Sequence, residues 1–135
     1  MHVERGSHIG LSQRSDGDWL EFASAWCTAW NAHDVEAVLS HFHEDAVFSS
    51  PAAKTIVPDS GGILRGKAAI ADYWRRGIKM IPNLHFRIER VFVGVDIVTI
   101  QYSNQNNVTV NEVLLFEGPL VRRGFGVYPL RAAGI

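Results

Sequence analysis

The sequence holds only one cysteine, Cys27, so no disulfide can form within the chain. A lone cysteine is typical of a reduced, cytoplasmic protein. Near Cys27 the sequence offers neither the base nor the positive charge that a catalytic thiolate requires. Long apolar runs are also missing, because none approaches the ~18 residues that a membrane-spanning helix needs. We therefore expect a cytoplasmic protein with no membrane partner.

An excess of charge is missing as well, since 13 Lys and Arg residues face 14 Asp and Glu residues and the formal net charge is -1. Without a basic excess, bulk electrostatics does not recruit nucleic acid. The 135 residues, of which 47% are hydrophobic, suit one domain with one core. Because the first residues contain no apolar signal core, we expect a disordered lead-in over 1–17, a single domain over 18–130 and a tail over 131–135.

Apolar residues recur at steps of three and four in two parts of the chain, which predicts helices there. The first helix is expected over Trp19–Asn31 and the third over Ala68–Lys79. A second, short helix is expected to follow Asp34, whose side chain suits an N-cap. The intervening segment Pro51–Gly62, rich in Pro, Ser and Gly, is expected to be a loop.

Runs of β-branched and aromatic residues predict strands, first over Ala46–Ser50 and Ile63–Arg65. A meander of four strands is expected over Leu84–Gly94, Ile97–Gln105, Val108–Glu117 and Leu120–Pro129. Asn106-Asn107 suits a two-residue turn between the second and third of these, because asparagine tolerates positive φ. The order predicts an α+β fold, in which a curved antiparallel sheet carries three helices on its concave face and leaves a cavity.

Three motifs in order carry a resemblance to a known family: Ala29-Trp30-Asn31-Ala32-His33-Asp34, then Phe42-His43-Glu44-Asp45-Ala46, then Gly66-Lys67-Ala68-Ala69-Ile70. Together they resemble the NTF2-like superfamily, which includes the SnoaL polyketide cyclases and the ketosteroid isomerases. The resemblance extends from Trp19 to about Tyr128. It implies a cone-shaped α+β fold, an apolar pocket and a homodimer. It does not imply one activity, because a fold hosts many functions.

The ketosteroid isomerase mechanism transfers only in part to this sequence. That enzyme uses an aspartate base and an oxyanion hole made of a tyrosine and a protonated aspartate. The resemblance places Trp26 at the tyrosine position, Ser50 at the base position and Glu112 at the protonated-aspartate position. Only one carboxyl group is kept, so Glu112 is the candidate acid/base.

The predicted turn places Gln101 directly across from Glu112, on the face that also carries Leu114 and Phe116. On the next strand, Arg123 has the same inward parity as Phe125. Glu112 is therefore predicted to be a pocket acid/base with Arg123 as its electrostatic partner. Two structural interpretations stay open: a partly buried Glu–Arg pair that orders the sheet, and an exposed residue at the rim.

The leading hypothesis is a small-molecule pocket protein that acts as an acid/base isomerase, cyclase or dehydratase on an apolar, carbonyl-bearing substrate, with no metal and no organic cofactor. The alternative is a non-catalytic ligand-binding or dimerisation module. Besides Glu112 and Arg123, the residues expected to bind the ligand are Trp26, Trp30, Phe48, Ser50, Tyr73, Trp74, Gln101 and Phe125. A homodimer is expected through an outer sheet face that carries Ile100, Tyr102, Asn111, Val113 and Leu115.

Three other patterns are weaker indications of a functional site. The run His41-Phe42-His43-Glu44-Asp45 contains metal-ligating residue types but falls at the end of the second helix, where we expect a surface. His85 opens a strand and is a weaker candidate for a pocket base. The run Gly61–Ala68 nearly matches a phosphate-binding loop but lacks both its hydroxyl residue and the buried strand before it.

Overall fold

The computed structural model describes residues 14–130, so residues 1–13 of the predicted lead-in and the predicted tail over 131–135 lie outside the described residues. The first helix, α1, spans Asp16–Asn31. It begins with a capping box, in which the Ser15 hydroxyl accepts from the Asp18 amide at 3.0 Å and the Asp18 carboxylate accepts from the Ser15 amide at 2.9 Å. Helix α1 therefore begins two residues before the predicted domain start at residue 18.

Three further α-helices follow, and one of them corrects the sequence prediction. Helix α2 spans Val35–Leu39 behind the expected Asp34 cap, and α4 spans Lys67–Met80. The predicted loop contains helix α3, Pro51–Ile56, and a 3-10 turn η2 over Pro58–Ser60. Ser50 caps α3 by accepting from the Ala52 amide at 3.1 Å. Pro51 is the first residue of that helix, where a proline loses no hydrogen bond.

Six strands form one sheet in the order β2-β1-β6-β5-β4-β3. Their bounds are β1 Phe42–Ser49, β2 Ile63–Arg65, β3 Arg87–Gly94, β4 Ile97–Ser103, β5 Thr109–Glu117 and β6 Leu120–Val127. All neighbouring pairs are antiparallel except β1 and β6, which are parallel. The expected antiparallel sheet is thus a mixed sheet, because β1 joins the meander beside its last strand.

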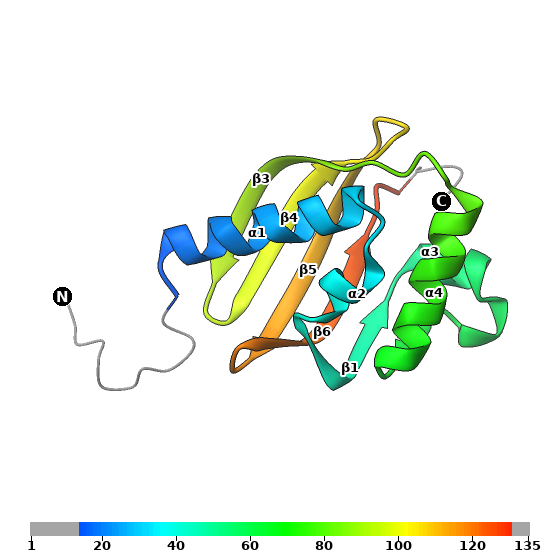
Figure 1. Ribbon diagram of the computed structural model, residues 1–135, viewed down its shortest axis with the longest axis horizontal. Coiled ribbons are helices and arrows are strands. Elements are labelled where there is room, and N and C mark those ends of the chain that lie inside the picture. Colours follow the sequence, from blue (N-terminus) through cyan, green and yellow to red (C-terminus); the bar gives the residue numbers. More distant parts are fainter. Residues whose placement is uncertain (1–13, 131–135) are drawn as a thin grey trace.

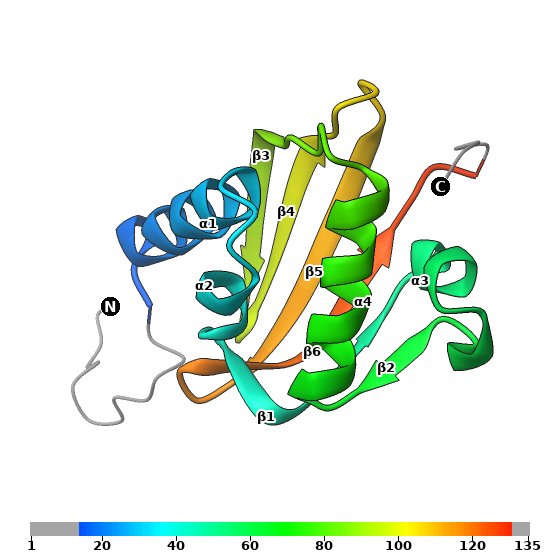
Figure 2. The same cartoon turned by 45° about the vertical axis from the view of Figure 1, so that its right-hand side comes forward.

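The helices α1, α2 and α4 lie on one face of the curved sheet, with α1 across β3 to β5 and α4 beside β1 and β2 (Figure 1). Figure 2 shows α4 over the sheet, with α3 at the end of the strand pair where β1 finishes and β2 begins. Aromatic and aliphatic side chains fill the space between the layers. None of the helices between residues 14 and 130 is long and apolar enough to span a membrane.

Two details of strand pairing reverse part of the predicted sheet faces. The connection between β4 and β5 is longer than two residues, since Ser103 pairs with Thr109 and the Asn104 side chain accepts from the Asn106 and Val108 amides. The pairing register therefore slips by one residue. In β6, a bulge lies between the pairs Leu115–Arg123 and Phe116–Val121. Each one-residue change sends the side chains that follow to the opposite face.

Candidate functional site

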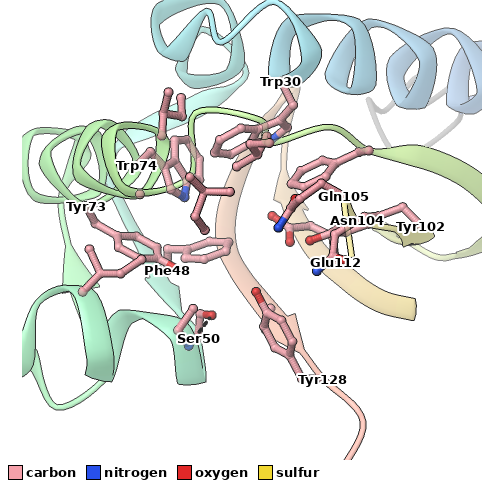
Figure 3. Close-up of a pocket in the computed structure, with 18 residues that line it drawn as sticks. Trp30, Phe48, Ser50, Tyr73, Trp74, Tyr102, Asn104, Gln105, Glu112 and Tyr128 are labelled. Atoms are coloured by element: carbon pink, nitrogen blue, oxygen red, sulfur yellow. Dashed lines mark hydrogen bonds between the residues drawn. The ribbon is translucent and has the colours of Figure 1, made fainter. Parts of the chain in front are cut away.

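One pocket lies between α4 and the concave face of the sheet (Figure 3). Its volume is about 100 Å³. Apolar and aromatic side chains make up most of the wall, and a small group of hydroxyl, amide and carboxyl groups faces the same space. The lining residues are Trp30, Phe48, Ser50, Ala52, Ile56, Tyr73, Trp74, Gly77, Ile78, Ile81, Leu84, Phe86, Tyr102, Asn104, Gln105, Glu112, Gly126 and Tyr128.

Glu112 contributes the one carboxyl group of this lining, from the middle of β5. The residue is only 5% exposed, and its strand neighbours are Ile100 and Gly126. Burial raises the pKa of Glu112 from an ordinary value of 4.5 to about 8. The cause is desolvation, which penalises the charged form. At pH 7 the carboxyl group therefore keeps its proton in roughly nine-tenths of the molecules.

Three tyrosines line the pocket together with this carboxyl group, Tyr73 from α4, Tyr102 from β4 and Tyr128 just after β6. Burial raises the pKa of Tyr128 to about 12, with the nearby Glu112 adding to the effect and the Ser50 hydroxyl opposing it. Burial also raises the pKa values of Tyr73 and Tyr102. All three phenols thus stay protonated at physiological pH and can donate hydrogen bonds into the pocket.

The aromatic rings of the wall are tilted against one another, so their faces and edges meet the cavity from several directions. Trp30 and Trp74 pack edge to face at 5.0 Å between ring centroids, and Phe48 packs edge to face against Trp74 at 5.5 Å. Phe86 and Tyr102 lie 4.2 Å apart. Such contacts hold each ring in one orientation.

The motif that contains Asn31 and His33 positions one side of this wall. The Asn31 amide group accepts from the Phe86 amide at 2.8 Å and donates to the Phe86 carbonyl at 2.9 Å. The His33 Nε2 atom lies 3.0 Å from the Leu84 carbonyl. Phe86 and Leu84 both line the pocket. The end of α1 therefore fixes the segment that leads into β3, although Asn31 and His33 do not line the pocket themselves.

The structure brings six of the predicted site residues together in the pocket: Trp30, Phe48, Ser50, Tyr73, Trp74 and Glu112. Trp26 does not reach it. That side chain is 1% exposed in the core, stacked at 5.7 Å on Phe86 behind the wall. Ser50 reaches the pocket from the N-cap of α3, so it combines a structural role with its position beside the tyrosines.

The predicted contact between Glu112 and Arg123 is wrong. The bulge in β6 turns Arg123 to the outer face, where it is exposed and lies over the Phe125 ring at 5.3 Å. Phe125 pairs with Val113 on that outer face too. Gln101 pairs with Asn111 rather than with Glu112, because of the slipped register of β4.

Sequence reasoning missed Tyr102, Tyr128 and Phe86 as pocket residues, and it placed Asn104 and Gln105 at the end of a predicted strand without a role in the pocket. The slipped register explains Tyr102, which was predicted on the outer face together with Ile100 and is buried inside. The position of Tyr128 could be predicted only in part. Tyr128 has the same parity as Gly126 once the bulge is known, but nothing in the sequence of β6 marks the bulge.

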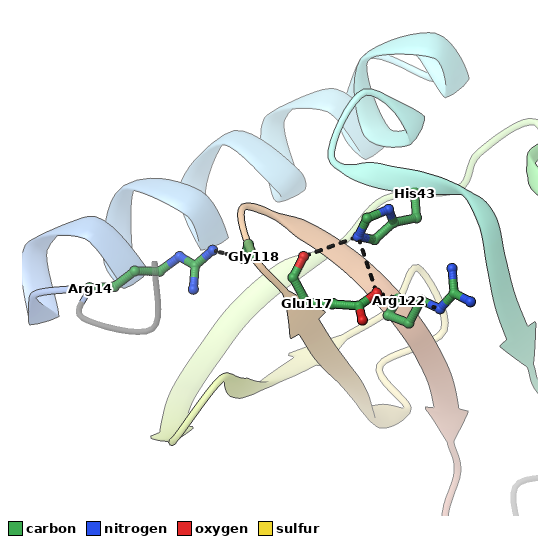
Figure 4. Close-up of polar contacts among 5 residues, drawn as sticks. All are labelled: Arg14, His43, Glu117, Gly118 and Arg122. Atoms are coloured by element: carbon green, nitrogen blue, oxygen red, sulfur yellow. Dashed lines mark hydrogen bonds and ion pairs between the residues drawn. The ribbon is translucent and has the colours of Figure 1, made fainter. Parts of the chain in front are cut away.

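The histidine-rich run is used for structural contacts (Figure 4). His43 Nε2 lies 3.0 Å from the Glu117 carbonyl and 3.7 Å from its carboxylate, and Arg122 lies 3.8 Å from the same carboxylate. His41 packs edge to face on Phe22 at 5.0 Å. His85 is exposed and outside the pocket lining. Within residues 14–130, no group of three or more His, Cys, Asp or Glu side chains is arranged to hold a metal ion.

A curved sheet that carries its helices on one face, with a pocket between the two layers, defines the cone-shaped NTF2-like class of fold. Residues 23–127 match the family model of the SnoaL-like domain. The chain belongs to the SnoaL-like family. No curated protein is similar enough to match.

Solved structures share the fold of this chain. A SnoaL-like protein of unknown function from Burkholderia thailandensis is 35% identical, with a TM-score of 0.80 over 85% of this chain and 97% of that chain. TerC, co-crystallised with polyporic acid, is 14% identical, with a TM-score of 0.68 over 82% and 90%. A protein of ketosteroid isomerase-like fold from Catenulispora acidiphila, in complex with trimethylamine, is 22% identical, with a TM-score of 0.66 over 82% and 86%.

Proposed function

We propose that this protein is a cofactor-independent acid/base enzyme that moves a proton on a small, apolar carbonyl compound, as an isomerase, cyclase or dehydratase does. One observation carries the proposal. Glu112 is a buried carboxyl group at the wall of an aromatic pocket, and burial raises its pKa to about 8. An acid/base group works best when its pKa lies near the working pH.

The tyrosines supply the second part of the proposed chemistry. When Glu112 loses its own proton, its poorly solvated carboxylate is a stronger base than a carboxylate in water and can take a proton from the carbon beside a carbonyl group. The negative charge then moves to the carbonyl oxygen. Hydroxyl groups of Tyr73 and Tyr128, which both interact with Ser50, are in position to donate hydrogen bonds to that oxygen.

Two buried polar atoms of the lining support a polar ligand. Trp30 Nε1, a donor, and Gln105 Oε1, an acceptor, have no hydrogen-bond partner within residues 14–130. Buried polar groups are rarely left without partners, so a bound ligand is a natural source of both. A volume of about 100 Å³ is below the ~300–1,000 Å³ of pockets for drug-sized ligands. The substrate is therefore small, or only one end of it enters the pocket.

The exchange of ketone α-protons with solvent deuterium tests this proposal without knowledge of the natural substrate. Cyclopentanone in deuterated buffer is expected to exchange faster with the protein than without it. Because the ionised form of Glu112 is the base, the rate should rise with pH, with its midpoint near pH 8 and a plateau above it. Proton NMR measures the exchange. Binding of the ketone without any exchange would favour the alternative, a ligand-binding module.

We also propose that the chain forms a homodimer through the outer face of the sheet. Of the residues predicted on that face, Asn111, Val113 and Leu115 do lie there, whereas Ile100 and Tyr102 are buried inside. The corrected outer face gains Phe125 from β6 and remains rich in apolar side chains. Asn111 Oδ1 is a buried acceptor on it without a partner in the described part of the chain. A twofold contact would cover these groups.

Val113→Arg is expected to convert the dimer to a monomer, because it places a charge in the middle of the outer face. Light scattering at micromolar concentration should give twice 15.0 kDa for the wild type and one chain mass for the variant. Arg122→Ala, at an exposed site at the end of the sheet, serves as the control and should stay dimeric. A wild-type monomer under these conditions would refute the dimer.

A further inference from the structure

The pocket lining contains one acidic side chain and no basic one. None of its 18 lining residues, all within the described range, is a lysine, arginine or histidine. Glu112 is the one group of the lining that can carry a charge near neutral pH. An anionic ligand would thus enter without a counter-charge and would face an ionisable carboxyl group. Such a site disfavours carboxylates and phosphates, since burying an unpaired charge is costly.

The aromatic rings of the lining also favour a positively charged ligand. Seven lining residues are aromatic: Trp30, Phe48, Tyr73, Trp74, Phe86, Tyr102 and Tyr128. The faces of such rings carry partial negative charge and attract cations within about 6 Å of the ring centre, most strongly for tryptophan. The edge-to-face packing of Trp30 on Trp74, and of Phe48 on Trp74, brings ring surfaces to the cavity from different sides.

From this arrangement we propose that the pocket binds a small alkylammonium cation, held by the aromatic rings and paired with the carboxylate of Glu112. The proposal goes beyond acid/base chemistry on a carbonyl compound, because it assigns the same cavity a second class of ligand. Size agrees with it, since about 100 Å³ admits a compact group such as a quaternary ammonium head. Gln105 Oε1, which lacks a partner in residues 14–130, offers a further partial negative charge.

Binding of a cation and ionisation of Glu112 must support each other. Desolvation keeps the proton on the carboxyl group in the empty pocket, and a bound cation replaces the lost solvation of the carboxylate. The cation should therefore bind more tightly as the pH rises. The groups that face Glu112, Tyr73 from α4, Tyr102 from β4 and Tyr128 after β6, titrate far above this range.

Three compounds of nearly the same shape and different charge test the proposal: tetramethylammonium, tert-butanol and trimethylacetate. Isothermal titration calorimetry on the full chain should rank their affinities in that order at pH 9. Between pH 6 and pH 9, tetramethylammonium should gain roughly 100-fold in affinity if Glu112 titrates near 8. The affinity of tert-butanol should change little, because it carries no charge.

Glu112→Gln removes the charge and keeps the size of the side chain. In this variant tetramethylammonium should lose its gain with pH and still bind better than tert-butanol, through the rings alone. The same substitution at Glu117, an exposed carboxylate on the same strand, removes a carboxyl group outside the pocket and should leave the affinities as they are. Circular dichroism verifies that both variants fold.

Equal affinities for the three compounds, or tetramethylammonium binding that Glu112→Gln leaves unchanged, would overturn this inference. Neither result depends on catalysis. If cyclopentanone exchanges its protons but tetramethylammonium does not bind, the ammonium site is wrong and the proposed enzyme stands. If tetramethylammonium binds with the expected dependence on pH but no ketone exchanges, the enzyme is wrong and the ammonium site stands.

Discussion

Glu112→Gln is expected to lower the rate of ketone proton exchange by roughly 100- to 10,000-fold, the usual contribution of a general acid/base group. Glutamine occupies the same volume and can still form hydrogen bonds, but it cannot take a proton. The effect should appear in kcat, because the proposed role belongs to the chemical step rather than to binding. Exchange rates measured by proton NMR over a range of ketone concentrations separate the two constants.

Glu117→Gln is the matched control for this prediction. Glu117 lies at the end of the same strand with a side chain that is 68% exposed, and it contacts His43 and Arg122 instead of the pocket. The rate of ketone proton exchange with the Glu117→Gln variant should equal the rate with the wild type. Equal rates in wild type and Glu112→Gln would remove Glu112 from the mechanism and leave the exchange to another group.

The second large effect concerns stability. The folded protein holds the Glu112 proton up to about pH 8, whereas the unfolded chain releases it near pH 4.5. The folded state thus binds more protons between these values, so the free energy of unfolding should fall as the pH rises through this window and level off above it. A difference of this size corresponds to about 5 kcal/mol.

Urea unfolding of wild type and Glu112→Gln at pH 5 and pH 9 isolates this contribution. The wild type should lose about 4 kcal/mol more than the variant between the two pH values, since all other titrating groups are shared. The variant should therefore keep more of its pH 5 stability at pH 9 than the wild type does. Parallel losses in both proteins would mean that Glu112 ionises in the folded state as it does in water.

Much of the architecture could be predicted because its signals are local. Apolar spacing identified α1 and α4, and alternation identified β3 to β6, all within a few residues of their bounds. The inward direction of Glu112 was predicted for the same reason, since it alternates with Leu114 and Phe116. Helix α3 was missed although its signal is local too. Pro51 was placed at the start of a loop, when a serine followed by a proline also begins a helix.

The strand residues that complete the site could not be predicted, because they depend on pairing between strands. One extra residue in the connection before β5 moved Gln101 out of the pocket and Tyr102 into it. The bulge in β6 moved Arg123 and Phe125 outward and left Gly124 and Gly126 inside. A Cβ added at Gly126 would lie 3.0 Å from the Ser50 hydroxyl oxygen, so this glycine keeps room beside the pocket hydroxyls. Neither change leaves a mark in the strand's own sequence.

The pKa of Glu112 is the quantity on which the proposed chemistry, the pH dependence of ammonium binding and the stability curve all depend. Carbon-13 NMR of protein labelled at glutamate carboxyl groups measures it directly, with Glu112→Gln to assign the signal. The structure predicts a signal that titrates near pH 8, apart from the exposed glutamates. A Glu112 signal that titrates at its ordinary value near 4.5 would contradict the central claim, because the carboxyl group would then be ionised and solvated throughout the physiological range.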